Sequence, residues 1–179
     1  MIRWLRDEAL LLLDGRGAIL DVARDVTRVL RESKVEGAVI GGVAVVLHGY
    51  VRTTIDVDVL VGESPKLVAE ALKDAGYSFH RAQREFRRGS VPVHLVTTRE
   101  TRVAPHKLIE IDGVQTISLP DLINLKLSSG LRDPLRAIDL ADVIGLIRAR
   151  RLTTAFATKL VKNVRPEFRK LATAVAERR

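Results

Sequence analysis

The sequence predicts an α+β fold, with a mixed central sheet flanked by helices and an all-helical C-terminal part. Residues 16–33 repeat apolar side chains at helical spacing, short β-branched segments separated by turn residues fill 37–119, and the pattern is helical from Pro120 onward. With 179 residues, of which 46% are hydrophobic, the chain is long enough to bury a core. We therefore predict a core of residues 1–119 and a helical subdomain of residues 120–179, which pack either separately or as one domain.

The first part of the chain is predicted to alternate between helix and strand. Residues 1–13 are predicted to form an amphipathic helix and not a signal peptide, because charged residues interrupt the apolar run. The second helix, 16–33, is predicted from the spacing of Ile19, Val22, Val26, Val29 and Leu30. Residues 37–42 read as a short buried strand that ends in glycine. Residues 43–49 fit a strand by their β-branched side chains and a helix by the glycine pair before them.

Alternation and capping residues define the next two elements. The segment IDVDVLV, residues 55–61, is predicted to be a strand because apolar and acidic residues alternate in it. Its core-facing side chains are expected to be Ile55, Val57 and Val59. Residues 64–76 are predicted to be a helix, since Ser64 suits the N-cap and Gly76 suits the C-terminal stop.

The middle and the end of the chain differ in pattern. Three short strands are expected within 77–97, with a turn at 88–90, and a hairpin is expected to turn at Asp112–Gly113. After Pro120 we predict four helices, at 120–129, 134–149, 153–163 and 166–177.

The composition limits the compartment and the partners. Because the chain has no cysteine, it has no disulfide and no thiolate metal site, which is compatible with the cytoplasmic location that we expect. No apolar run reaches the roughly 18 residues of a membrane span, so we expect no membrane association. The net charge of +8 favours an anionic partner, which is a nucleic acid, a nucleotide or an acidic protein. A merely solvated basic surface is the alternative explanation.

Two aspartates interrupt the apolar strand. Side chains at i and i+2 of a strand point to one face, so Asp56 and Asp58 are expected to project together. Neighbouring carboxylates repel each other unless a cation lies between them, and Mg²⁺ prefers carboxylate and phosphate oxygens. The pair therefore predicts a Mg²⁺ site, with Mn²⁺ as an alternative ion. The alternative explanation is an exposed pair on an edge strand.

A glycine pair precedes these aspartates. Gly41 and Gly42 would let the backbone approach a phosphate at the start of a helix, although an ordinary tight turn also uses glycine. The whole segment GGVAVVLHGYVRTTIDVDVLV resembles the signature of the DNA polymerase β-like nucleotidyltransferase superfamily. The closest resemblance is to the minimal and AbiEii-type nucleotidyltransferases of abortive-infection and toxin–antitoxin systems. The signature covers residues 39–61, and a looser match covers 117–143.

The resemblance implies a nucleotidyltransferase fold and assigns roles to individual residues. Asp56 and Asp58 would ligate the metal. The implied nucleotide-binding residues are Gly41, Gly42, Arg52 and Thr54. The guanidinium of Arg52 suits either a phosphate or Asp56, and a plain surface arginine is the alternative.

The later stretch adds a lysine and a second acidic pair. The resemblance implies that Lys126 contacts the triphosphate or the acceptor and that Asp139 is a catalytic aspartate. Asp142 lies three residues further on, which places it on the same helix face. A lysine lying along the surface of an amphipathic helix is the alternative for Lys126.

One position departs from the superfamily pattern. A third carboxylate is expected on a later strand, but the segment SVPVHLVTT has His94 there. Histidine can accept a proton but binds Mg²⁺ poorly. Either His94 is the base of a one-metal site, or Asp139 or Glu110 supplies the carboxylate, or the site has lost catalysis and binds nucleotide only. A partly buried histidine bonded to a backbone carbonyl is the structural alternative.

These observations lead to two functional hypotheses. The first is a Mg²⁺-dependent nucleotidyltransferase that moves NMP from an NTP to an acceptor, which is either an RNA such as tRNA or a protein. The resemblance adds a toxin role with a separate antitoxin as partner. The second is a catalytically impaired module of the same fold that binds nucleotide or nucleic acid. The basic run at 80–89 suits an RNA backbone or is simply an exposed hairpin.

Overall fold

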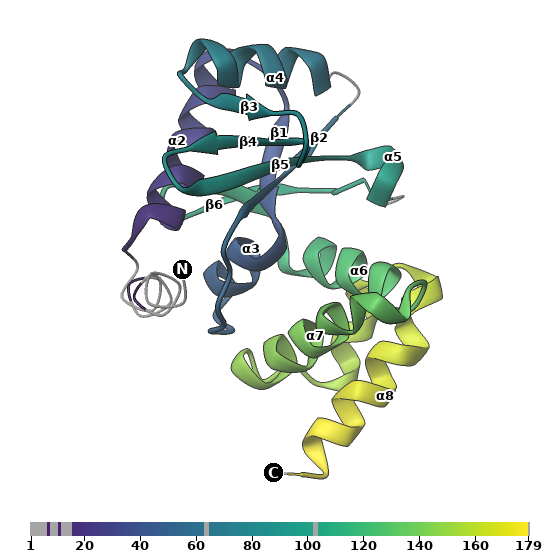
Figure 1. Cartoon of the computed structure of the whole chain (residues 1–179). Helices are drawn as coiled ribbons and strands as arrows, with labels where there is room; N and C mark the ends of the chain where they lie inside the picture. Colours follow the sequence, from purple (N-terminus) through teal and green to yellow (C-terminus); the bar gives the residue numbers. More distant parts are fainter. Residues whose placement is uncertain (1–6, 8–10, 12–15, 63–64, 102–103, 179) are drawn as a thin grey trace.

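The computed structural model describes residues 7, 11, 16–62, 65–101 and 104–178, and it confirms the predicted α+β class. A mixed sheet with helices on both faces is joined to a group of C-terminal helices (Figure 1). Within these residues, no helix is both long enough and apolar enough to cross a membrane.

Seven strands of the described chain form one sheet. They are β1 (Gly37–Ile40), β2 (Val57–Val61), β3 (Ser78–His80), β4 (Glu85–Arg88), β5 (Val91–Thr97), β6 (Leu108–Ile111) and β7 (Val114–Ile117). Their order across the sheet is β3-β4-β5-β2-β1-β7-β6. Strand β2 lies between antiparallel β1 and parallel β5. Because β2 is central, the aspartates at its start are not on an edge strand.

Seven α-helices and three short 3₁₀ segments complete the part that the structure describes. The helices are α2 (Ala18–Glu32), α3 (Gly41–Leu47), α4 (Pro65–Asp74), α5 (Thr98–Thr101), α6 (Leu119–Gly130), α7 (Ala137–Ala149) and α8 (Arg165–Ala176). The 3₁₀ segments are η1 (Pro134–Arg136), η2 (Thr154–Lys159) and η3 (Lys162–Val164). Ser118 caps α6 by accepting a hydrogen bond from the backbone N–H of Asp121.

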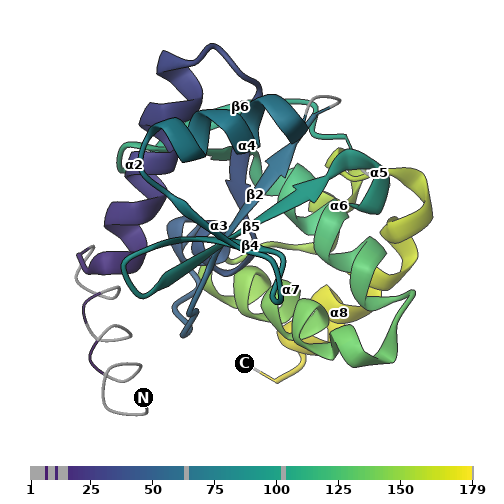
Figure 2. The same ribbon diagram turned by 45° about the horizontal axis from the view of Figure 1, so that its top comes forward.

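The two faces of the sheet pack against different helices. One face presents alternate residues of β1, β2 and β5, such as Val39, Val59 and Val93, to helices α2 and α4. The other face, which includes Ile40 and Leu60, packs against α6, α7 and α8 (Figure 2). The C-terminal helices therefore share a hydrophobic core with the sheet. The division at residues 119 and 120 stays a prediction.

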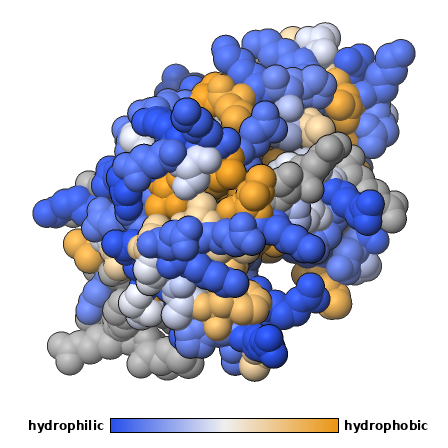
Figure 3. Space-filling view, turned by 90° about the horizontal axis from the view of Figure 1, so that it is seen from above, coloured by the Kyte–Doolittle hydropathy of each residue, from blue (hydrophilic) through white to orange (hydrophobic). Residues whose placement is uncertain are grey.

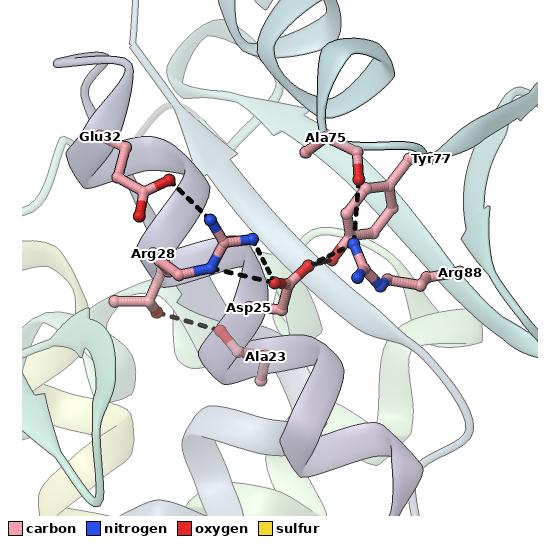
Figure 4. A network of polar contacts seen from close by, with 8 residues as sticks. Ala23, Asp25, Arg28, Glu32, Ala75, Tyr77 and Arg88 are labelled. Carbon is pink, nitrogen blue, oxygen red and sulfur yellow. Dashed lines mark hydrogen bonds and ion pairs between the residues drawn. The ribbon is translucent and has the colours of Figure 1, made fainter.

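A polar network ties α2 to the far edge of the sheet (Figure 4). The Tyr77 hydroxyl donates to the Asp25 carboxylate at 2.7 Å, and Arg88 pairs with the same carboxylate at 2.8 Å. Arg28 bonds Asp25 from within α2 at 2.6 Å. Burial and the neighbouring Asp25 raise the pKa of Tyr77, so this phenol remains a donor. Seen from the top of Figure 1, the surface is mostly hydrophilic, and apolar residues gather near the middle of this face (Figure 3).

Local predictions mostly agree with these elements. The segment 43–49, which was left open between strand and helix, lies mostly in helix α3, because the chain turns at Gly41, which has φ +66°. Two predictions differ. Ile55 was expected in the core but is 50% exposed, since it lies before the start of β2. The helix expected at 153–163 is instead the 3₁₀ segments η2 and η3, separated by the extended residue Leu160.

Two further expectations concern the N-terminal half. The helix expected at 1–13 falls almost wholly outside the described residues, and the Ser64 cap falls wholly outside them.

The hairpin at Asp112–Gly113 is confirmed, with positive φ at both residues as a type I′ turn requires.

Candidate active site

The site forms where β1 ends and β2 begins. In the sheet register, Asp58 lies opposite Ile40 on one side and opposite His94 on the other. Gly41 follows Ile40 directly. A Cβ atom on Gly41 would lie 2.0 Å from the Asp58 Oδ2 atom, so this position has no room for a side chain. The chain therefore needs glycine here both for the positive φ and for the approach of Asp58.

Gly42 has a comparable packing role beside Thr54. A Cβ on Gly42 would lie 2.3 Å from Thr54 Oγ1 and 2.9 Å from Arg52 Nη2. The Thr54 hydroxyl donates to Asp56 Oδ1 at 3.1 Å. The two glycines thus let the carboxylate-bearing segment lie directly against α3. Their predicted contact with a triphosphate stays a prediction.

Asp56, Asp58 and His94 form a compact group. Each offers one ligand atom, and these atoms lie within 4.8 Å of one another. His94 Nδ1 is 3.4 Å from Asp56 Oδ2 and 3.6 Å from Asp58 Oδ1. The hydrogen bond to Asp58 raises the pKa of His94 to about 9, with further contributions from Glu85 and Asp56, against an opposing effect of burial. In the metal-free protein the imidazole is therefore the counter-charge of the acidic pair.

The donor set suits a divalent cation. Adjacent ligands of an octahedral ion with bonds near 2.1 Å lie about 3 Å apart, so side-chain atoms spaced as these are need only small shifts to share one ion. Two carboxylate oxygens and one imidazole nitrogen are ordinary ligands for such ions. The space that Gly41 leaves open is filled by Asp58, which fixes one ligand in place.

Glu85 was missed by the sequence analysis. Its carboxylate lies 3.2 Å from His94 Nε2, and it also pairs with Arg87 at 2.6 Å. The side chain is only 7% exposed. The signal was present, because Glu85 is the one acid in the basic run at 80–89. Extending the antiparallel pairing of Phe86 with Val93 by one residue sets it beside His94.

A buried row of charges faces the acidic group. The Lys126 ammonium lies 2.7 Å from Asp139 and 2.9 Å from Asp142. Asp142 pairs in turn with Arg52 at 2.8 Å, and Asp139 pairs with Arg136 at 2.9 Å. The row therefore runs Arg52–Asp142–Lys126–Asp139–Arg136, with a cation at each end and one in the middle.

The three central members of this row are buried, and each is paired with an opposite charge. Lys126 is 3% exposed and both aspartates are 1% exposed, so Lys126 is not a lysine lying along the helix surface. Burial alone would raise the pKa of Asp139, but the Lys126 ammonium and the bonds from Lys126 and Arg136 hold it below its usual value. Arg136 was also missed. Its place three residues before Asp139 on the same helical turn could have identified it.

The acidic group and the charged row line a common cavity. A cavity of about 300 Å³ is lined by the carboxylates Asp56 and Asp58 and by the cations Arg52, Lys126 and Arg136. Gly42, Thr54 and Asp139 also line it. A second cavity of about 190 Å³ adjoins it, shares Asp58, Lys126 and Arg136, and reaches Gly41. The fold thus brings the predicted site residues to one place, with Gly41 and His94 at its margin.

Two alternatives from the sequence analysis, which concern Glu110 and His94, do not agree with the structure. Glu110, one candidate for the missing carboxylate, is on the edge strand β6 and pairs with Arg31 at 2.7 Å. It is therefore outside the site. Among the described hydrogen bonds, none joins His94 to a backbone carbonyl. The histidine with that environment is His48, whose Nε2 lies 2.9 Å from the Ile117 carbonyl oxygen.

Comparisons with solved structures agree with the fold. The chain is similar to an antigenic nucleotidyltransferase-like protein from Paracoccidioides brasiliensis, with a TM-score of 0.51 and 19% identity over 72% of this chain and 74% of that one. It also resembles a tRNA-processing enzyme in an apo form, with 19% identity and a TM-score of 0.41 over 74% of this chain and 42% of that one. The first likeness supports the fold alone, and the second is too weak to support an argument.

Sequence comparison identifies the family. No protein with a curated description matches the chain significantly. Residues 17–176 match a family model described as nucleotidyltransferase of unknown function, DUF6036. The match spans the sheet, the site and the C-terminal helices, and the chain belongs to this nucleotidyltransferase family.

Proposed function

We propose that the protein is a divalent-cation-dependent nucleotidyltransferase that moves NMP from an NTP to an acceptor hydroxyl. The acceptor oxygen forms a bond to the α-phosphorus, the bond from that phosphorus to the bridging oxygen breaks, and pyrophosphate leaves. The acceptor hydroxyl loses its proton to solvent water. The observation that carries the proposal is a single cavity lined both by the carboxylates Asp56 and Asp58 and by cations that buried aspartates hold in place.

The cations that line the cavity suit a polyphosphate. Arg52 and Arg136 both line the cavity, and each is anchored by a buried aspartate of α7. Anchored guanidinium groups need little reorganisation when they bind phosphate oxygens, and phosphoryl transfer depends mainly on positioning and charge neutralisation. Lys126 lies between these two arginines in the row and pairs with both aspartates. In this proposal Lys126 holds the row in place and adds positive charge to the cavity.

The carboxylates that line the cavity supply the proposed cation site. Asp56 and Asp58 would hold the cation, and Thr54 fixes Asp56 through its hydroxyl. A bound divalent ion would neutralise phosphate charge and make the α-phosphorus more electrophilic. The sequence predicts Mg²⁺ as this ion, with Mn²⁺ as the alternative.

The charge distribution favours RNA as the acceptor. Residues 148–179 contain ten Lys and Arg and two Asp and Glu, whereas residues 1–147 contain twenty of each kind. The entire net charge of +8 therefore lies in the last 32 residues. Several of these cations are exposed: Arg148, Arg150, Arg151, Lys162, Arg169 and Arg178. A nucleic acid such as tRNA is the partner whose repeated phosphates match such a surface.

The affiliation with AbiEii-type toxins stays a prediction that the sequence resemblance alone supports. Growth arrest on expression of the wild-type chain, and normal growth with Asp58→Asn, would support the toxin role. Arrest by both proteins would separate toxicity from this site.

A transfer assay tests the proposed function. The purified protein is incubated with each α-labelled NTP, Mg²⁺ or Mn²⁺, and total RNA, and label is followed on RNA and on protein. We expect label on RNA with the wild-type protein and a loss of at least 100-fold with Asp58→Asn, since removal of a metal ligand disables charge neutralisation. Asp74→Asn, which changes an exposed aspartate of α4, is the matched control.

The outcomes separate the two hypotheses. Label on the protein fraction would replace RNA with a protein acceptor. Binding of an NTP without transfer in any combination would support the impaired module. Equal transfer by Asp58→Asn and the wild type would overturn the site.

A further inference from the structure

His94 is the feature of the site that the proposed function leaves without a role. It occupies the register position beside Asp58 where a third carboxylate was expected. Its Nδ1 faces both aspartates, and its Nε2 faces Glu85 at 3.2 Å. The imidazole is thus held between an acidic pair in the cavity and a buried carboxylate behind it.

Glu85 determines which ring nitrogen is available. A carboxylate only accepts hydrogen bonds, so it binds the N–H form of Nε2. That leaves Nδ1 facing Asp56 and Asp58, where a bound cation would replace the proton that neutralises the pair in the metal-free protein. Histidine ligands of metal ions commonly donate their other N–H to a carboxylate in this way, which fixes the ring and raises the basicity of the ligand nitrogen.

Glu85 itself is firmly positioned. Arg87 Nε donates to Glu85 Oε1 at 2.6 Å, which leaves Oε2 for the histidine. Burial alone would raise the pKa of Glu85, but Arg87 and His94 hold it below its usual value. The same strand, β4, also pairs directly with β5, which carries His94. The carboxylate is therefore a rigid support and not a mobile surface acid.

We infer that His94 is a third metal ligand, supported by Glu85, and that it makes the site select Mn²⁺ over Mg²⁺. This inference rests on the proposed function for the presence of an ion between Asp56 and Asp58. Mg²⁺ strongly prefers oxygen ligands, whereas imidazole is a good ligand for first-row transition ions. Mn²⁺ combines a tolerance of nitrogen with the octahedral oxygen coordination that phosphate chemistry requires.

The test measures metal binding and does not depend on turnover. Mn²⁺ binding to the full chain is titrated by the loss of the EPR signal of aqueous Mn²⁺, and Mg²⁺ binding is measured by competition. Pulsed EPR of the bound Mn²⁺ then reports whether a nitrogen nucleus is coupled to the ion. We expect nitrogen coupling in the wild type, and its absence in His94→Asp.

Two variants test the contributions of the imidazole and of its support. In His94→Asp the preference for Mn²⁺ should fall by about tenfold, because all three ligands are then oxygen donors. In Glu85→Gln the Mn²⁺ affinity should fall by about 10- to 100-fold, which is the usual effect of losing such a supporting carboxylate. His80→Asp and Glu70→Gln, both at exposed positions, are the matched controls.

The possible results are decisive for the inference. Bound Mn²⁺ without nitrogen coupling in the wild type, or a Mn²⁺-to-Mg²⁺ ratio that His94→Asp leaves unchanged, would overturn it. Failure of Mn²⁺ to bind would also overturn it and would leave His94 as the permanent counter-charge of the aspartates. Nitrogen coupling without any nucleotidyl transfer would support the metal site while refuting the proposed function. Nucleotidyl transfer without nitrogen coupling would refute only His94 as a metal ligand.

Discussion

Gly41 shows how one residue can determine the geometry of a site. Its φ of +66° turns the chain from β1 into α3, and the missing side chain leaves room for the Asp58 carboxylate. A residue with a side chain would have to adopt a strained backbone conformation and displace a proposed metal ligand. The two penalties can be separated, because other glycines of the chain have positive φ but open surroundings.

Gly41→Ala is expected to lower the free energy of unfolding by about 3 kcal/mol or more, which combines about 1–2 kcal/mol of backbone strain with the clash against Asp58. Gly76→Ala is the control, since Gly76 has φ +89° and nothing within 4 Å of its Cβ position. Chemical denaturation measures both. A loss for Gly41→Ala no larger than that for Gly76→Ala would show that the contact with Asp58 is unimportant.

His48 makes stability depend on pH. Burial lowers the pKa of His48, partly opposed by the hydrogen bond to the Ile117 carbonyl. As the pH falls below the unfolded value of about 6.5, the unfolded chain takes up a proton before the folded protein does, so folding becomes less favourable. Stability conferred by neutral His48 is therefore present above pH 6.5 and is lost on acidification.

The wild type should lose unfolding free energy between pH 7 and pH 5.5 with a slope of up to about 1.4 kcal/mol per pH unit from this group. His48→Gln keeps an N–H donor but does not titrate, so its slope should be smaller. His80→Gln, at an exposed position, should retain the wild-type slope. Urea denaturation across this range measures all three, and parallel slopes for His48→Gln and the wild type would contradict the assignment.

Helices α6 and α7 are joined through charge as well as through apolar packing. Lys126 is the single α6 cation between two buried carboxylates of α7. Removal of one partner from a buried ion pair leaves an uncompensated charge, which costs more than the pair itself contributes. The interface between these helices should therefore be sensitive to this lysine.

Lys126→Met should lower the free energy of unfolding by about 3–5 kcal/mol, because the methionine fills a similar volume but leaves Asp139 and Asp142 partly unpaired. Lys73→Met, an exposed replacement near the end of α4, should change it by less than about 0.5 kcal/mol. Denaturant titrations of the two variants provide the comparison. A stable Lys126→Met protein that still binds NTP would show that the row of charges is dispensable.

Over the whole molecule the charge is unevenly distributed, because residues 1–147 carry no net charge and residues 148–179 carry +8. Helix α7 joins the neutral part to the basic C-terminal part, since it carries Asp139 and Asp142 of the site and also Arg148. An RNA held by the basic part would therefore contact the end of a helix that carries site residues. Such binding should weaken steeply with salt, since each phosphate contact releases counterions.

A triple replacement of Lys162, Arg169 and Arg178 by glutamine should weaken RNA binding and reduce the slope of log K against log salt by about 2, at roughly 0.7 for each single-strand phosphate contact. The control replaces Lys66, Lys73 and Arg99, which removes the same charge from exposed positions of the neutral part. Filter binding over a range of salt concentrations measures both. An equal effect of the two sets would indicate a general effect of net charge and no dedicated RNA surface.

Much of the fold followed from local pattern. The apolar spacing of 16–33, Pro120 in the first turn of α6, and the Asp112–Gly113 turn specify their elements through neighbours close in sequence. Where local signals were balanced, the sequence left the outcome open. The β-branched residues of 43–49 favoured a strand and the glycine pair favoured a helix, and the turn at Gly41 and burial on both sides of α3 decided for the helix.

By itself the sequence determined the α+β class, the strand that begins at the two aspartates, the glycine pair, and the family that these motifs resemble, whereas the central position of that strand came from the structure. Only the tertiary structure decided that His94 faces both aspartates with Glu85 behind it, and that Lys126 is buried between Asp139 and Asp142. The physical reason is distance along the chain. Periodicity and capping act over a few residues, whereas strand order and helix packing bring together groups such as Arg52 and Asp142, which are 90 residues apart.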